Sequence, residues 1–416
     1  MSIVLKGGEV LGHGSADVLV EDGRISRIGP GLDAERVLDC TGAVVVPGFV
    51  DLHAHLREPG NEEAETVASG SAAAAAGGYV AIVAMPNTQP PADTASVVAR
   101  VKAMGDAVGL CRVIPAGTIS LGRHGEVLAP FGELAAEGVV LFTDDGTCVR
   151  HAGLMRRALE YALSVGGIVA NHAEDADLCG SGVAHEGPVA ARLGLPARPP
   201  EAEEIVVARD LALARATAGR LHIPHVSTAA AVDLIRDAKA RGVAVTAEVT
   251  PHHLFFTEER LEDYDTVFRV NPPLREKGDL EALRAGLADG TIDAVATDHA
   301  PHTSADKERE FDLAPPGMIG LETAFAAVST ALDDFSLETL VERMSTAPAR
   351  ILGLGDEFGG ALAEGRPAHL AVVEPDSEWV VRPSDLRSRS RNCPFVGERL
   401  RGRVRYTMYQ GRVTHP

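Results

Sequence analysis

The sequence has little cysteine, few aromatic residues and no long hydrophobic run. Its 416 residues include five cysteines, none in a C-x-x-C pair, and aromatic residues make up 4% of the chain. An odd number of widely spaced cysteines argues against a disulfide framework or a cysteine zinc knot, so we expect a reduced, cytoplasmic protein. The most apolar stretch, 72–85, contains two glycines and ends before Pro86, and the start MSIVLKGGEVLGHGS lacks an apolar signal core. We therefore expect neither a membrane span nor a signal peptide.

Positive charge is also scarce. The chain has 39 Lys and Arg residues against 59 Asp and Glu residues, which gives a formal net charge of −20. Such a field repels phosphate backbones and anionic membranes, so we expect a small-molecule substrate and no nucleic-acid or membrane partner. A composition of 45% hydrophobic and 24% charged residues is typical of a folded protein and excludes general disorder.

The two ends of the chain share one pattern. Segments such as ADVLVEDGRISRIG and GRVRYTMYQGRVT alternate apolar and polar residues between turn signals, which is typical of short β-strands. We expect residues 1–46 and 360–416 to form one composite β domain, a small sandwich built from both termini. The long interior, 47–359, has a different character and is expected to form a separate domain.

The interior alternates short β-branched runs with stretches rich in Ala, Glu and Arg. This alternation predicts an α/β fold, a (β/α)8 TIM barrel, in which each strand is followed by a helix. A doubly wound open sheet is the alternative, but it does not require a polar cluster at every strand end. The eight expected strands are 44–50, 79–85, 111–116, 139–143, 168–170, 221–225, 243–250 and 292–297.

Polar residues with metal-binding side chains follow most of these strands. His53 and His55 lie two apart, so on a strand both imidazoles point to the same face. The His-x-His pattern alone also fits two surface histidines, but further ligand-type residues follow the other strands, and the active sites of these barrels lie at the carboxyl ends of the strands. Those further residues are Asn87, Asp144, Asp145, His172, His225, His252, His253, Asp298, His299 and His302.

The residue types favour a transition-metal site. Imidazole with carboxylate suits zinc or a similar divalent ion better than calcium or magnesium, which prefer oxygen ligands. Four histidines and two aspartates exceed the needs of one tetrahedral zinc. Two ions about 3.5–4 Å apart that share a bridging group and a bridging hydroxide would use the whole set.

Several longer motifs carry a family resemblance. The chain resembles the bacterial class I dihydroorotases of the amidohydrolase superfamily, over nearly its whole length and with the motifs in order. The D-x-H-x-H pattern marks only the superfamily, whereas REPG and ATDHAPH are specific for dihydroorotases. The matching segments are DLHAHLREPG (51–60), FTDDG (142–146), NHAE (171–174), EVTPHHL (248–254), NPPLR (271–275), ATDHAPH (296–302) and GLETA (320–324).

The resemblance implies two zinc ions per subunit and a bridging acidic group. Many superfamily members bridge their metals with a carboxylated lysine on the fourth strand, but this chain has no lysine between the third and sixth expected strands. Asp145 is the expected replacement, with Asp144 as the alternative. The resemblance assigns His53, His55 and Asp298 to one zinc, and His172 and His225 to the other.

The resemblance also implies the substrate contacts. Arg57 is expected to bind the substrate carboxylate, because a guanidinium matches a carboxylate in two hydrogen bonds, and Asn87 to add an amide donor. A surface ion pair with Glu58 or Glu62 is the alternative for Arg57. Relatives often carry an aromatic residue where this chain has Pro316, which puts the contribution of Pro316 in doubt. The remaining contacts implied are His55, Asn271, His302, Pro316 and Gly317.

The activity implied is the reversible, zinc-dependent cyclisation of N-carbamoyl-L-aspartate to L-dihydroorotate in pyrimidine biosynthesis. Asp298 would serve as base and then as acid, and the charged segment 302–316 is expected to be a mobile loop beside the site. His252, His253 and His299 are expected to pack around the ligands. A homodimer, associated with aspartate carbamoyltransferase, is also implied. The alternatives are a hydantoinase, dihydropyrimidinase or allantoinase, and an inactive scaffold that has lost ligands.

Overall fold

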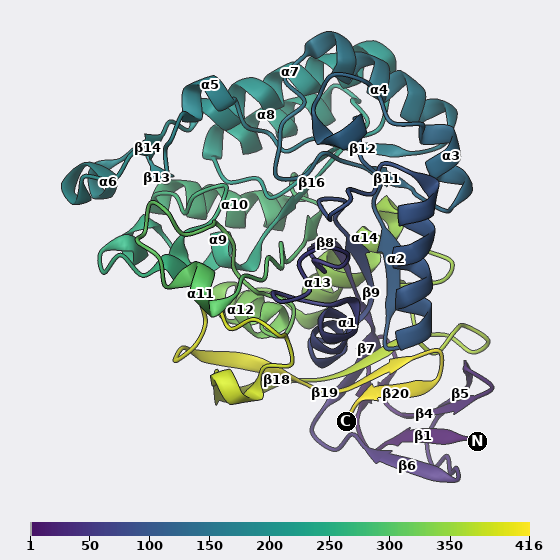
Figure 1. The fold of residues 1–416 in the computed structure, drawn as a ribbon. Coiled ribbons are helices and arrows are strands. Elements are labelled where there is room, and N and C mark those ends of the chain that lie inside the picture. Colours follow the sequence, from purple (N-terminus) through teal and green to yellow (C-terminus); the bar gives the residue numbers. More distant parts are fainter. Residues whose placement is uncertain (1) are drawn as a thin grey trace.

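Strands from both ends of the chain lie together in the computed structural model, which describes residues 2–416 (Figure 1). One sheet has the order β5 (Arg24–Gly29), β4 (Asp17–Glu21), β1 (Ile3–Lys6) and β6 (Arg36–Asp39). The other has the order β20 (Arg412–His415), β19 (Arg399–Tyr409), β18 (Leu370–Val380), β7 (Val44–Pro47), β2 (Glu9–Val10) and β3 (Gly14–Ser15). One buried cluster joins them, and it includes Leu5, Val20, Val45, Leu370 and Met408.

The interior of the chain forms parallel strands in two groups. The first group has the order β10 (Arg112–Pro115), β9 (Tyr79–Ala84) and β8 (Phe49–Ala54). The second has the order β11 (Leu141–Phe142), β12 (Ile168–Ala170), β15 (Leu221–Ile223), β16 (Val245–Val249) and β17 (Ala294–Val295). Parallel bridges from Gly117 to Phe142 and from Ala54 to His299 join the two groups at both edges. The strands therefore follow one another in sequence order around a closed ring, at whose carboxyl end the candidate site lies.

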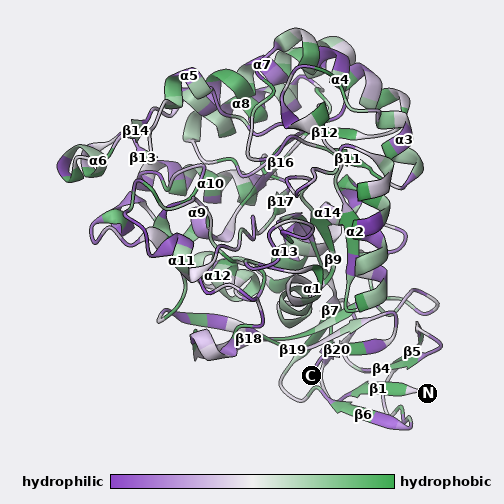
Figure 2. Cartoon of the chain, viewed as in Figure 1, coloured by the Kyte–Doolittle hydropathy of each residue, from purple (hydrophilic) through white to green (hydrophobic). Residues whose placement is uncertain are grey.

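Helices surround this ring (Figure 1). Most of the longer helices bury one face. For example, α4 buries Leu154, Met155, Ala158, Leu159 and Ala162, and Figure 2 shows hydrophilic and hydrophobic residues side by side along it. The longer helices are α1 (Val67–Ala76), α2 (Ala95–Val108), α4 (Ala152–Ser164), α7 (Glu201–Thr217), α8 (Ala229–Ala240), α10 (Lys277–Asp289) and α12 (Ala324–Ala331).

Shorter elements occupy the connections. They are α3 (Phe131–Ala136), α5 (Ala176–Cys179), β13 (Ala184–His185), α6 (Pro188–Leu193), β14 (Ala197–Arg198), α9 (Pro251–Phe255), α11 (Ser304–Lys307), α13 (Leu337–Val341) and α14 (Ala347–Ile351). Within residues 2–416, no helix combines the length and the apolar character that crossing a membrane requires.

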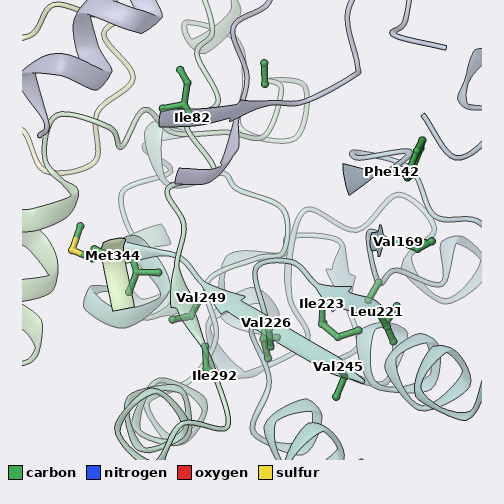
Figure 3. Close-up of a cluster of buried hydrophobic side chains, with 14 of the residues drawn as sticks. Ile82, Phe142, Val169, Leu221, Ile223, Val226, Val245, Val249, Ile292 and Met344 are labelled. Carbon is green, nitrogen blue, oxygen red and sulfur yellow. The ribbon is translucent and has the colours of Figure 1, made fainter. Parts of the chain in front are cut away.

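The strands of the ring are buried on both faces. On β12, Val169 belongs to one apolar cluster, whereas its neighbours Ile168 and Ala170 belong to another. This division follows from the alternation of side chains along a strand, and double burial is typical of parallel sheets. Figure 3 shows the first cluster, in which residues of successive strands lie together with Met344.

The expected α/β fold is confirmed, but the first expected strand, 44–50, is wrong. This stretch forms two strands that are separated at Gly48. The first, β7, joins the terminal sheet, and the second, β8, begins the ring. A Cβ atom at position 48 would lie 2.3 Å from Cγ1 of Val80, so only glycine fits. As a result, Asp51 and His53 lie within the strand, not beyond its end.

Candidate metal and substrate site

His53 and His55 lie at the carboxyl end of β8 and face Asp298, which follows β17. Nε2 of His55 is 3.1 Å from Oδ1 of Asp298, and Nε2 of His53 is 3.5 Å from the same oxygen. The backbone N–H of His55 donates to the carbonyl of His299 over 2.8 Å, which fixes the two strand ends together. All three side chains are buried.

Asp145 brings the remaining two histidines into the same cluster. Its Oδ1 lies 3.2 Å from Nε2 of His53, 3.7 Å from Nδ1 of His172 and 3.9 Å from Nε2 of His225, and its Oδ2 lies 3.5 Å from Nε2 of His55. Burial raises the pKa of Asp145, but the charge of His53 and hydrogen bonds from the histidines outweigh it and hold that pKa well below its usual value. Asp145 is therefore an ionised carboxylate at the centre of the four imidazoles.

Asp144 points away from this cluster. Its Oδ1 accepts the backbone N–H groups of Ile119 and Ser120 over 2.9 and 3.0 Å, and its Oδ2 accepts the Ser120 hydroxyl. The turn after β11 thus points its two consecutive carboxylates in different directions. Of the two aspartates open as the bridge, only Asp145 lies among the histidines.

Three of the imidazoles are oriented by acceptors on their outer side. Nδ1 of His53 donates to Oε1 of Glu248 over 2.9 Å, and Nδ1 of His55 donates to Oδ1 of Asn87 over 2.9 Å. Nε2 of His172 donates to the carboxylate of Glu174 over 3.1 Å. Because a carboxylate or amide oxygen only accepts, the outer nitrogen of each ring carries a proton, and in the neutral imidazole the inner nitrogen has the lone pair that a metal ion would bind.

This donor set fits divalent metal ions. Nε2 of His53 is buried and has no hydrogen-bond partner among residues 2–416, although it lies beside the Asp145 carboxylate. The ligand atoms of His53, His55 and Asp298 lie within 4.8 Å of one another, as do those of His53, Asp145 and His225. Buried carboxylates and unpaired lone pairs are costly unless a cation neutralises them, and mixed imidazole and carboxylate donors suit zinc and related ions.

A cavity of about 180 Å³ opens beside this cluster. All the expected metal and substrate residues line this cavity except His53, which is buried. The lining residues are His55, Arg57, Asn87, Asp145, Gly146, His172, His225, Asn271, Asp298, Ala300, His302, Pro316 and Gly317.

Arg57 is directed into this cavity, not into a surface ion pair. Its Nε donates to the carbonyl of Pro301 over 3.1 Å, while the carboxylates of Glu58 and Glu62 accept the backbone N–H groups of Val67 and Gly60. Burial lowers the pKa of Arg57 to about 10, so the guanidinium stays charged at neutral pH. It is a half-buried cation at the mouth of an acidic cluster, where an anionic group of a ligand would be bound.

Residues from two loops also line the cavity. Nε2 of His302 donates to the carbonyl of Pro316 over 2.8 Å, and Asn271 donates to the carboxylate of Glu174. Pro316 thus contributes its backbone carbonyl, which holds His302. The segment 302–316, which we expected to be a mobile loop, contains α11 and is bonded to its surroundings at several points.

The three histidines outside the expected ligand set have other surroundings. His253 pairs with Thr250 Oγ1 and the carbonyl of Pro272, and His299 pairs with Glu65. His252 is buried with Nε2 unpartnered within the described chain, and burial lowers its pKa to about 4.

Sequence reasoning missed several polar residues that support the site. Glu248 was given no role, although a carboxylate inside an apolar strand is a sequence signal for a buried polar partner. Arg198, whose Nη1 donates to Oδ1 of Asn271 over 2.6 Å, lies on the short strand β14 and had no such signal. Asn392 donates to the carbonyls of Ala300 and Gly317, although it lies in the terminal segment that we expected to belong to the β domain.

Comparison with known proteins decides which family this site belongs to. A profile of the family described as Dihydro-orotase-like matches residues 42–231. A dihydroorotase of Mycobacterium tuberculosis is 50% identical over 100% of this chain and 98% of its own length. A dihydroorotase of Anaeromyxobacter dehalogenans is 48% identical over 99% of this chain and 98% of its own.

The chain belongs to the dihydroorotase family. Its fold is also shared with solved enzymes outside that family. An L-hydantoinase (dihydropyrimidinase) from Arthrobacter aurescens superposes with a TM-score of 0.89 at 26% identity, covering 99% of this chain and 96% of that enzyme. A D-hydantoinase structure superposes with a TM-score of 0.86, also at 26% identity, over 99% of this chain and 95% of that one. This chain and these hydantoinases thus share their architecture.

Proposed function

We propose that this member of the dihydroorotase family catalyses the reversible cyclisation of N-carbamoyl-L-aspartate to L-dihydroorotate and water, in de novo pyrimidine biosynthesis. The observation that carries the proposal is the half-buried Arg57 guanidinium in the same cavity as the His and Asp cluster. The substrate ring bears a carboxylate, whereas hydantoin and dihydrouracil are uncharged. A cation beside the reacting centre is needed for the first and not for the others.

The metal assignment belongs to the same proposal. His53, His55 and Asp298 would hold one zinc ion and His172 and His225 the other, and the Asp145 carboxylate would serve both, as the resemblance to the class I enzymes implies. No lysine lies between Lys102 and Lys239, so a carboxylated lysine does not enter. When bound, the two ions supply Lewis-acid polarisation of the carbonyl and lower the pKa of a coordinated water.

The protein residues divide the remaining work. Arg57 and the amide N–H of Asn87 bind the ring carboxylate, and they orient the ring so that the C–N bond to be cleaved faces Asp298. In hydrolysis, Asp298 accepts the proton of the attacking water and returns it to the departing ring nitrogen. Ring closure runs this sequence backwards and takes up one proton, because a dianion becomes a monoanion.

The architecture and assembly complete the proposal. We assign the strand ring with its helices, 47–359, to a (β/α)8 metal-dependent hydrolase barrel, and 1–46 with 360–416 to a composite β domain. The closed order of parallel strands supports the first assignment, and the shared core of the two terminal sheets supports the second. A homodimer, and association with aspartate carbamoyltransferase, follow from the family resemblance and are tested by light scattering with and without that enzyme.

The deciding experiment compares four rings. The purified, zinc-loaded protein is incubated in parallel with L-dihydroorotate, hydantoin, dihydrouracil and allantoin. We expect hydrolysis of dihydroorotate alone. Hydrolysis of the uncharged rings instead would assign the protein to the hydantoinases, and inactivity on all four with metal bound would indicate a scaffold.

A further inference from the structure

Lys307 lies in the segment that joins two residues of the cavity wall, His302 and Gly317. It is the last residue of the short helix α11. Thr303 caps the start of this helix, and its hydroxyl accepts the backbone N–H of Asp306 over 3.2 Å. Only 9% of Lys307 is exposed, which is unusual for a lysine. This buried amine has no role in the proposed reaction.

The ammonium group of Lys307 is surrounded by main-chain carbonyls. Nζ lies 2.9 Å from the carbonyl of Thr266, 2.9 Å from that of Pro315 and 3.4 Å from that of Arg269. Burial, together with the nearby charge of Arg269, lowers the pKa of Lys307 to about 7. In its protonated form the amine has three N–H donors, and these three acceptors can use all of them. The Thr266 hydroxyl in turn donates to the carbonyl of Lys307. Lys307 therefore joins residues 266–269 to its own helix and to Pro315.

These bonds continue directly to the cavity wall. The backbone N–H of Gly317 donates to the carbonyl of Arg269 over 2.9 Å, and Nη1 of Arg269 donates to the carbonyl of Phe311 over 2.8 Å. On the cavity side, His302 donates to the carbonyl of Pro316. Residues 315–317 are thus held between Lys307 and Arg269 on one side and His302 on the other.

Gly317 packs closely against His302 and Ala300 at this wall. Gly317 has φ +144°, and a Cβ atom there would lie 2.8 Å from Nε2 of His302 and 2.8 Å from Cβ of Ala300. A small shift of residues 315–317 therefore moves the imidazole of His302 as well. The metal cluster lies on other elements and makes no use of these bonds.

We propose that Lys307 is a positioning residue for substrate binding, which fixes residues 315–317 and through them His302 at the wall of the cavity. This inference rests on the proposed function for its substrate. Without the amine, the carbonyl of Pro315 loses its donor, whereas the carbonyls of Thr266 and Arg269 keep the backbone N–H groups of Arg269 and Gly317. Residues 315–317 then lose their bond to α11, and the Pro315 carbonyl moves to reach water. Substrate binding then weakens, while the metal ligands and Asp298 keep their places.

Three variants test the proposal. Lys307→Met removes the donors and keeps most of the side-chain volume, Lys307→Arg restores donors, and Lys277→Met is the control because that side chain is 83% exposed on α10. For Lys307→Met we expect KM for L-dihydroorotate to rise by about tenfold or more, as for the loss of hydrogen bonds to a charged group. We expect kcat to change little, zinc content to match the parent, and Lys307→Arg to recover part of the loss.

The outcomes separate this inference from the proposed function. Turnover by the parent enzyme tests the function, and the comparison between variants tests the role of Lys307. An unchanged KM in folded Lys307→Met would overturn the role, because substrate binding would not depend on this amine. A loss of kcat and of zinc as large as the change in KM would also overturn it, because Lys307 would then support the structure of the whole site.

If Lys307→Met fails to fold, a measurement on the unaltered holoenzyme tests the proposal instead. Lysines are acetylated with a small reagent and followed by mass spectrometry, with and without saturating L-dihydroorotate. We expect Lys307 to react far more slowly than Lys277, and the ligand to slow Lys307 several-fold further while Lys277 is unaffected. Reaction of Lys307 at the rate of Lys277, or no effect of the ligand on Lys307, would contradict the proposal.

Discussion

Nδ1 of His53 donates to Oε1 of Glu248 over 2.9 Å, which links strand β8 to strand β16 beneath the metal cluster. The second oxygen of Glu248 accepts from Nε2 of His222 over 3.0 Å. Burial raises the pKa of Glu248, but the hydrogen bonds from His222 and His53 outweigh it and bring that pKa to about 2. Glu248 is therefore a permanent carboxylate that fixes the tautomer of His53.

We predict that Glu248→Gln weakens zinc binding. A glutamine can present its NH₂ group to Nδ1 of His53 and so move the ring proton to Nε2, where the metal binds. Loss of such an outer partner typically costs about 10–100-fold in metal affinity. The affinity is measured by competition with a chromophoric chelator, with the exposed Glu281→Gln as control. Equal zinc affinity in parent and variant would show that the bond is not used.

The two neighbouring aspartates are predicted to behave in opposite ways. Asp145→Asn removes the charge shared by the imidazoles, so we expect loss of at least one zinc ion and of activity. Asp144→Asn leaves the cluster untouched but weakens the hydrogen bonds to Ile119 and Ser120, so we expect zinc retention and a loss of about 1–3 kcal/mol in stability. Metal analysis and urea unfolding of both variants measure the difference. The reverse pattern would identify Asp144 as the bridge.

The sequence predicted the members of the site better than their supports. His-x-His on a strand and ligand-type residues at the strand ends follow from the strand period and from the direction of parallel strands. The separate directions of Asp144 and Asp145 depend on the turn after β11, which residue types do not reveal. Lys307 and Arg198 act on segments 38 and 73 residues away in sequence, and only the packed chain shows those contacts.

The misplaced first strand has a different cause. Residues 44–50 read VVVPGFV, and the Pro-Gly pair at 47–48 is a local turn signal across which the expected strand was drawn. In the structure, the N–H of Gly48 donates to the carbonyl of His369 over 3.0 Å, and Val80 approaches Gly48 closely. Both partners are distant in sequence. The boundary itself was therefore visible in the sequence, whereas the sheet that each half joins depends on tertiary contacts.

Arg57→Lys is predicted to impair binding of the charged substrate selectively. Lysine keeps the positive charge but loses the planar pair of N–H donors that matches a carboxylate. We expect kcat/KM for L-dihydroorotate to fall by about 100-fold, equivalent to about 3 kcal/mol, with zinc content unchanged. Steady-state kinetics with Arg156→Lys, a change at an exposed ion pair on α4, provides the comparison. Full activity of Arg57→Lys would remove Arg57 from the substrate site.

Glu258 gives a prediction about the pH dependence of stability, away from the metal cluster. It is 3% exposed, and its Oε2 has no hydrogen-bond partner among the described residues. Burial, together with the nearby charge of Glu276, raises the pKa of Glu258 from 4.5 to about 7. The folded state therefore holds its proton more tightly than the unfolded state does. The stabilisation is complete below pH 4.5 and is lost as the pH rises to about 7.

Glu258→Gln removes this titration, because the glutamine is neutral at every pH. Relative to the parent, the variant should gain stability between pH 5 and pH 8, by about 2 kcal/mol when a shift of this size is discounted for partial solvent screening. Urea unfolding of the two proteins at both pH values, with metal removed by a chelator, isolates the effect. The exposed neighbour variant Glu259→Gln should show no such gain. A stability difference between Glu258→Gln and the parent that stays constant with pH would mean that Glu258 is already charged in the folded protein at pH 5, held by contacts that compensate its burial.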